Sequence, residues 1–173
     1  MNRSTRADVP APTAQMDEPT RQQIVKELTS AYNMEVETVA NYLVNSIHLD
    51  GMLAMEVKES LASDLAEELE HAKQLARRIK ILGGKPPGSQ ALKMEQAQLQ
   101  PPDDSIDVTS VIRGVIDAET DAINQYQRII EMTDGVDYVT QDLCINLKGD
   151  EEEHRREFVG FLREYEAMQR GFK

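Results

Sequence analysis

Two Glu-x-x-His motifs hold the side chains in this sequence best suited to binding metal: Glu68 with His71, and Glu151 with His154. Residues three apart lie on one face of a helix, so each motif would present a carboxylate beside an imidazole. Both motifs fall within apolar stripes of helical spacing. The stripe around the second motif consists of Leu143, Leu147, Glu151, His154, Phe158, Phe161 and Tyr165. Buried polar groups need partners, so the two motifs predict one shared polar centre inside a helical bundle.

Two further glutamates extend this pattern. Glu35 and Glu119 each interrupt an apolar stripe, and each precedes a tyrosine, Tyr42 or Tyr126, by seven residues. The distance from this glutamate to that of the following motif is 33 residues in the first half of the chain and 32 in the second. The matched spacings indicate a duplicated helical hairpin, in which each copy contributes one Glu and one Glu-x-x-His.

Four carboxylates and two imidazoles at one level of a bundle would be unstable in a low-dielectric core unless cations neutralise them. Two divalent ions balance four carboxylates, and mixed oxygen and nitrogen ligands suit iron or manganese. A four-cysteine zinc site is excluded because Cys144 is the only cysteine, which is expected to be a small core residue. Pairing with Arg or Lys is the alternative, but neither occupies the four stripes at this level.

Four helices are expected to position these residues, over 21–47, 52–82, 106–132 and 137–168. Thr20 and Gln23 have the spacing of a capping box for the first helix. Short Asp-Gly turns at 50–51 and 134–135 would make the helices of each half antiparallel neighbours. The glycine pair at 83–84 would end the second helix.

Residues 83–105 break the helical pattern with a proline pair near each end. Their middle, 89–98, has the composition for a short surface helix. A connection of this length can run along a helix of about 30 residues, roughly 45 Å, so the second and third helices would be parallel. The predicted fold is an all-α antiparallel four-helix bundle with one long crossover. Two domains joined by a linker are the alternative, although neither half has enough apolar faces to be a comfortable domain.

Composition narrows the function classes. A net charge of −12 argues against nucleic-acid binding by the body of the protein. The chain length suits one domain, with a flexible proline-containing arm at 1–19 and the bundle at 20–173. Arg3 and Arg6 of the arm form no basic cluster. No apolar run is long enough to span a membrane and no signal-peptide segment is evident, so a cytoplasmic protein is expected.

Other polar residues near the motifs could be mistaken for parts of the site. Glu37, Glu70, Glu152 and Glu153 flank the candidate ligands but point off the stripes. We expect these side chains to be solvated, with a negative route for metal as the alternative. His48 lies at the end of the first helix and is expected to be a surface or capping residue.

The sequence resembles the ferritin-like superfamily over nearly all of residues 20–168, and most closely the bacterioferritins and the Dps-like mini-ferritins. The stretches that match are residues 35–42, Glu68-Leu69-Glu70-His71, Asp117-Ala118-Glu119 and Asp150-Glu151-Glu152-Glu153-His154. The resemblance implies two iron ions per subunit, with manganese as the alternative. By this resemblance, Glu35 and Glu119 would be terminal ligands, and Glu68 and Glu151 would bridge the two metals. His71 and His154 would each cap one metal. Tyr42 and Tyr126 would line the site.

The sequence also departs from the family pattern. Leu69 stands where bacterioferritins carry a haem-ligating Met, so haem is not expected. The fifth helix of 24-subunit cages is not expected either, which favours a homo-oligomeric cage of 12 subunits. The motifs imply a site within each bundle, as in the Dps-like group called thioferritins. That group often has a cysteine pair near the site, whereas Cys144 has no partner.

The expected function is a ferroxidase that oxidises ferrous iron with dioxygen or hydrogen peroxide at a di-iron centre, for iron storage or detoxification in a protein cage. A di-metal redox enzyme without storage, such as a peroxidase or a manganese catalase, is the alternative because the same ligands would serve. A DNA-compacting Dps is supported only by the arm, and no nucleic-acid partner is expected.

Overall fold

The computed structural model describes residues 16–171, which form four long helices and no strand. The helices are α1 (Glu18–His48), α2 (Met55–Ile81), α3 (Val108–Thr133) and α4 (Tyr138–Gly171). Three short 3₁₀ helices lie between them, at Met52–Ala54, Ser89–Ala91 and Ala97–Leu99. The predicted all-α bundle is therefore confirmed. Among the described residues, no helix combines the length and apolar character needed to cross a bilayer.

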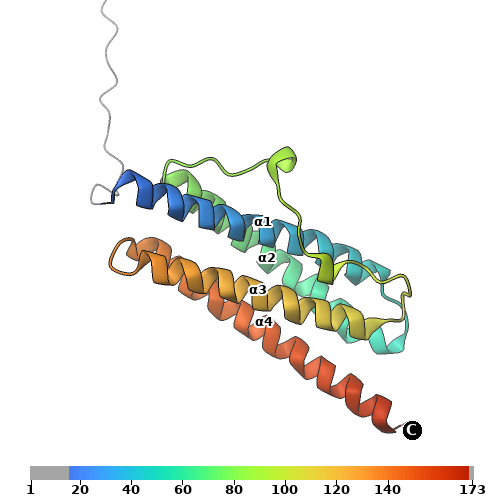
Figure 1. Ribbon diagram of the computed structural model, residues 1–173. Helices are drawn as coiled ribbons and strands as arrows, with labels where there is room; N and C mark the ends of the chain where they lie inside the picture. Colours follow the sequence, from blue (N-terminus) through green and yellow to red (C-terminus); the bar gives the residue numbers. More distant parts are fainter. Residues whose placement is uncertain (1–15, 172–173) are drawn as a thin grey trace, which may run out of the picture.

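The bundle consists of two helical hairpins that lie side by side (Figure 1). Helix α1 packs most closely on α2, and α3 on α4. The connection between α2 and α3 runs back along the length of the bundle, so these two helices are parallel, as the crossover prediction requires. Most of the arm expected at 1–19 lies outside the described residues.

Helix α1 begins three residues earlier than predicted. Asp17 is its N-cap and accepts a hydrogen bond from the Thr20 amide at 2.8 Å, and Pro19 lies in the first turn. The predicted capping box of Thr20 and Gln23 is therefore wrong. Asp17 caps the helix instead, and Pro19 is tolerated because the first turn of a helix does not need its backbone amide. Helix α2 ends at the predicted glycines: Gly83 has a φ of 80°, and the Gly84 amide donates to the Ile79 carbonyl.

A buried carboxylate anchors the crossover. The Glu37 carboxylate accepts hydrogen bonds from the backbone amides of Glu95, at 2.6 Å, and of Gln96, at 2.8 Å. The Gln96 side chain also donates to the Thr38 hydroxyl and accepts from Asn41. The expectation of a solvated Glu37 is wrong. The crossover covers this side chain, and the carboxylate accepts hydrogen bonds from two backbone amides of the crossover. The surface helix expected at 89–98 is replaced by two 3₁₀ turns.

Two apolar clusters enclose the middle of the bundle. One includes Leu61, Ile112 and Phe158, and the other includes Leu28 and Leu75. Each of the four helices contributes residues to both clusters. Along each helix, the predicted metal-binding residues lie between those of one cluster and those of the other. Cys144 is a buried member of the second cluster, as expected.

Gly114→Ala should destabilise the protein, although alanine normally favours a helix. A Cβ at this position of α3 would lie 2.4 Å from the Gln98 carbonyl oxygen of the crossover. We expect a loss of about 1–3 kcal/mol in the free energy of unfolding, measured with urea.

The matched control is Gly160→Ala on α4, where a Cβ meets no atom within 4 Å. This change should stabilise the protein by about 0.5–1 kcal/mol. Equal effects of the two substitutions would show that the crossover does not pack closely on α3.

Candidate metal centre

The structure brings all six predicted metal-binding residues together at the middle of the bundle. Helix α1 supplies Glu35, α2 supplies Glu68 and His71, α3 supplies Glu119, and α4 supplies Glu151 and His154. None of these residues is more than 6% exposed. Each side chain lies on the inward stripe of its helix, so the fold places six polar groups where an apolar core would otherwise continue.

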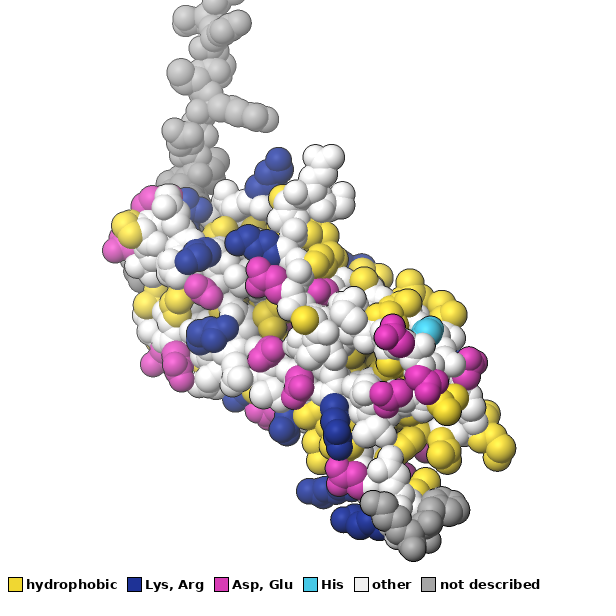
Figure 2. Space-filling model, turned by 45° about the vertical axis from the view of Figure 1, so that its right-hand side comes forward, with side chains coloured by type: hydrophobic (Ala, Val, Ile, Leu, Met, Phe, Trp, Pro, Cys, Tyr) yellow, Lys and Arg dark blue, Asp and Glu magenta, His cyan; other side chains and the backbone are white. Residues whose placement is uncertain are grey.

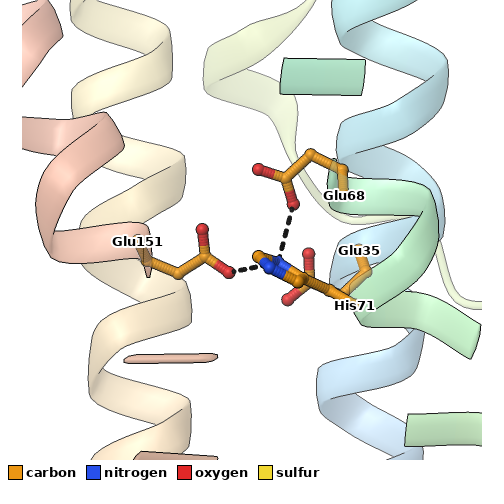
Figure 3. A group of neighbouring side chains, drawn as sticks. All are labelled: Glu35, Glu68, His71 and Glu151. Carbon is orange, nitrogen blue, oxygen red and sulfur yellow. Dashed lines mark ion pairs between the residues drawn. The ribbon is translucent and has the colours of Figure 1, made fainter. Parts of the chain in front are cut away.

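The six residues form two overlapping groups with the spacing of metal ligands. One group is Glu35, Glu68, His71 and Glu151, and Figure 3 shows these side chains converging from three helices. The other group is Glu68, Glu119, Glu151 and His154. Within each group, one candidate ligand atom from each residue lies within 4.8 Å of the others. Glu68 and Glu151 belong to both groups, which matches the bridging positions that the resemblance implies for them.

Both histidines point their Nδ1 atoms at the shared carboxylates. His71 Nδ1 lies 3.0 Å from Glu151 Oε1 and 3.7 Å from Glu68 Oε2. His154 Nδ1 lies 3.1 Å from both Glu68 Oε1 and Glu151 Oε2. The two rings are stacked, with centroids 6.3 Å apart. Nδ1 is therefore the nitrogen that each ring offers to the centre.

Two tyrosines support the unshared glutamates across the bundle. The hydroxyl of Tyr42, on α1, donates to Glu119 on α3, and the hydroxyl of Tyr126, on α3, donates to Glu35 on α1. Both tyrosines are fully buried. The expectation that they line the site is consistent with this exchange, in which each hydroxyl orients a carboxylate from the other half of the chain.

The metal-free centre shifts the pKa values of its members in opposite directions. Burial raises the pKa of Glu35 and Glu119 well above the usual value, and the negative charges of Glu68 and Glu151 add to this effect. Burial alone would also raise the pKa of Glu68, but the two histidines outweigh it and lower this pKa to about 2.

The histidines are strongly basic in turn. Burial alone would lower their pKa values, but the carboxylates of Glu151 and Glu68 raise the pKa of His71 to about 10 and that of His154 to about 12. Without metal, the imidazoles thus supply the positive charge that the carboxylates require.

Several buried ligand atoms lack a hydrogen-bond partner. They are Glu68 Oε1 and Oε2, Glu151 Oε1 and His71 Nδ1. The Nδ1 atom of His71 is close to Glu151 Oε1, but the two do not meet the geometry of a hydrogen bond. Within residues 16–171, no Lys or Arg forms an ion pair with any of the six residues. Atoms that converge without bonding one another fit a pair of divalent cations.

Comparison with known proteins identifies the family. The ferritin-like domain matches residues 25–168. The chain belongs to the ferritin-like family. A bacterial ferritin from Neisseria meningitidis is 28% identical to this ferritin-like chain over 152 residues, which cover 87% of the chain and 93% of the relative.

Solved structures agree with this assignment. A dodecameric thioferritin from Bacteroides fragilis has a TM-score of 0.80 and 25% identity to the ferritin-like chain, with 92% of this chain and 94% of that one covered. The Desulfovibrio desulfuricans bacterioferritin, whose diiron site was characterised in different catalytic states, has a TM-score of 0.73 and 22% identity, with 87% and 84% covered. The ferritin-like fold is thereby established.

Sequence analysis missed two carboxylates that adjoin the histidines. Asp150 Oδ2 lies 3.3 Å from His71 Nε2, and Glu67 Oε2 lies 3.4 Å from His154 Nε2. A signal was present, because each immediately precedes the Glu of its own motif. The contacts themselves join different helices, so spacing along the chain does not predict them.

Metal loading should release protons. At pH 7 the raised pKa values keep both histidines protonated without metal, whereas a metal ligand must be neutral. Adding Mn(II) in weakly buffered solution should release about two protons per subunit from the histidines alone, and metal affinity should rise from pH 6 to pH 8.

In the metal-free protein, the stabilisation from His71 is complete below pH about 6.5 and is lost as the pH rises through about 10. Substitution of His48, the histidine outside the motifs, should leave the release unchanged. Tighter binding at lower pH would contradict this description of the centre.

Proposed function

We propose that this protein is a ferroxidase that binds two Fe(II) ions per subunit and oxidises them with dioxygen or hydrogen peroxide. The observation that carries the proposal is the pair of overlapping ligand groups at the buried centre, whose shared carboxylates retain unpaired oxygen atoms. Two divalent ions would neutralise the four carboxylates. Iron is the substrate here, and manganese is the alternative metal for the same ligands.

Each protein group has a defined task in this proposal. Glu68 and Glu151 bridge the two ions, since they alone belong to both ligand groups. Glu35 and His71 complete one coordination sphere, and Glu119 and His154 complete the other. Tyr42 and Tyr126 hold the two terminal carboxylates in place. A pair of bound iron ions supplies the two electrons that reduce dioxygen or peroxide, and the apolar clusters on both sides limit the access of water to the site.

The ferroxidase role extends to storage or detoxification of iron in a homo-oligomeric cage, with 12 subunits favoured. The match to a dodecameric thioferritin supports this assembly. Apolar side chains also gather at one end of the bundle, as Figure 2 shows, and a cage would cover them. The exposed residues there include Ile47, Met52, Leu53, Met55 and Ile106.

Iron stoichiometry tests the ferroxidase proposal. Fe(II) added to metal-free protein in air should give a fast absorbance change that ends at about two irons per subunit, because each bundle holds one two-metal centre. Glu68→Gln should abolish this phase, since it removes a carboxylate common to both ligand groups.

The matched control is Glu70→Gln, in the same motif but on the exposed face, where Glu70 pairs with Lys73 and Arg77. It should leave the fast phase unchanged. A wild-type protein without the phase, or a phase that survives Glu68→Gln, would disprove the proposal.

The mass in solution tests the cage. Light scattering should report a closed assembly of about a dozen 19.5 kDa chains, since the related thioferritin is dodecameric. A monomer or dimer that retains the fast phase would instead indicate a di-metal redox enzyme without storage.

A further inference from the structure

A buried polar stripe on α1 faces the crossover. Its members are four residues apart on one side of the helix, and none is more than 7% exposed: Asn33, Glu37, Asn41 and Asn45. The crossover forms hydrogen bonds with Glu37, Asn41 and Asn45. Asn45 Oδ1 is left unpaired, but its Nδ2 donates to the Leu99 carbonyl at 3.0 Å. Asn33 differs because its buried Oδ1 has no hydrogen-bond partner and lies beside open space.

The open space is a cleft of about 450 Å³ between α1, α3 and the crossover, which passes over α1 towards α3 in Figure 1. A cleft of this volume is large enough for a small molecule. Its buried polar side chains are Asn33, Glu37, Gln96 and Gln125.

Three of these four buried side chains are satisfied by the protein. Glu37 accepts from two crossover amides, and Gln96 bonds to Thr38 and Asn41. Gln125 donates to Glu27 and accepts from Arg128. An unpaired buried acceptor costs free energy, so Asn33 Oδ1 is the atom of this cleft that calls for a donor from a ligand.

Exposed charges of both signs border the same cleft. The cations are Lys93 and Arg128, and the anions are Glu95 and Asp121. Within residues 16–171, none of these four side chains forms an ion pair. A ligand that carries both signs can pair with both kinds of charge, whereas a simple anion or cation would meet repulsion from one of them.

We infer that this cleft binds a small amino-acid zwitterion whose side chain ends in an N–H donor. The carboxylate of the ligand pairs with Lys93 and Arg128, and its ammonium group pairs with Glu95 and Asp121. The side-chain N–H donates to Asn33 Oδ1. The cleft is separate from the metal centre, because none of these residues belongs to either ligand group.

Calorimetric titration of the full-length, metal-free protein with L-glutamine and L-arginine tests this assignment. Both amino acids should bind saturably at one per subunit. L-Norvaline has no side-chain donor and leaves Asn33 Oδ1 unpaired, so it should bind about 10-fold more weakly. Agmatine has the guanidinium and ammonium groups of arginine without the carboxylate, and it should also bind about 10-fold more weakly.

A variant of Asn33 tests the acceptor. Asn33→Ala should weaken glutamine and arginine by about 10-fold and leave norvaline unchanged, so the preference for a donor disappears. Thermal unfolding of the ligand-free variant should not occur at a lower temperature than that of wild type, since Asn33 Oδ1 makes no bond within the protein. In wild type, the methyl resonance of Met34, which lines the cleft, should shift on saturation, and that of the distant Met52 should not.

Matched variants on α3 separate a local ion pair from the overall charge of the protein. Asp121→Asn should weaken both amino acids by about 10-fold, while its amide oxygen can still accept from Gln98. Asp117→Asn removes the same charge one helical turn earlier, from an exposed residue that does not line the cleft. This control should bind both amino acids like wild type.

Three results would overturn the assignment. The first is the absence of saturable binding of both glutamine and arginine. The second is norvaline that binds wild type as tightly as glutamine does, or a preference for glutamine that survives Asn33→Ala. The third is an equal loss in Asp121→Asn and Asp117→Asn, which would assign the effect to net charge. None of these results bears on iron oxidation, so failure here and failure of the proposed ferroxidase activity are distinguishable.

Discussion

Mutual repulsion among buried carboxylates is the constraint on which this structure depends. Placing an ion in a protein interior costs several kcal/mol, and four acidic side chains meet at one level of the bundle. The apolar clusters on both sides hold the helices together against this cost, since each fully buried Leu, Ile or Phe contributes about 1.5–3 kcal/mol. Without metal, the centre is tolerated because Glu35 and Glu119 favour their protonated forms and the histidines carry positive charge.

The sequence was sufficient to predict the fold, and it singled out the six residues that the structure brings together in the middle of the bundle. Helical periodicity made each misplaced carboxylate visible, and the duplication distinguished a shared site from chance occurrences of Glu-x-x-His. These signals are local or repeat along the chain, so they do not require knowledge of which helices touch. The tyrosines followed from the same spacing, and their hydroxyls meet carboxylates of the opposite half.

Features that depend on contacts distant in sequence could not be predicted in this way. From the sequence alone Glu37 looks like a surface residue. In the structure, backbone amides of the crossover donate hydrogen bonds to its carboxylate. Glu67 and Asp150 look like ordinary members of an acidic run until the opposite helix brings an imidazole beside each. The start of α1 differs from the prediction for another reason. Asp17 and Thr20 are both good N-cap residues, and only the backbone path decides between them.

The division of ligands between the two hairpins has a consequence for the order of events during synthesis. Each ligand group takes three residues from one hairpin and the fourth from the other. A nascent chain that has completed α1 and α2 therefore holds no full coordination sphere, and neither does a fragment that lacks α4. The candidate metal centre is therefore complete only when both hairpins have docked, and metal bound there would report that the whole bundle has folded.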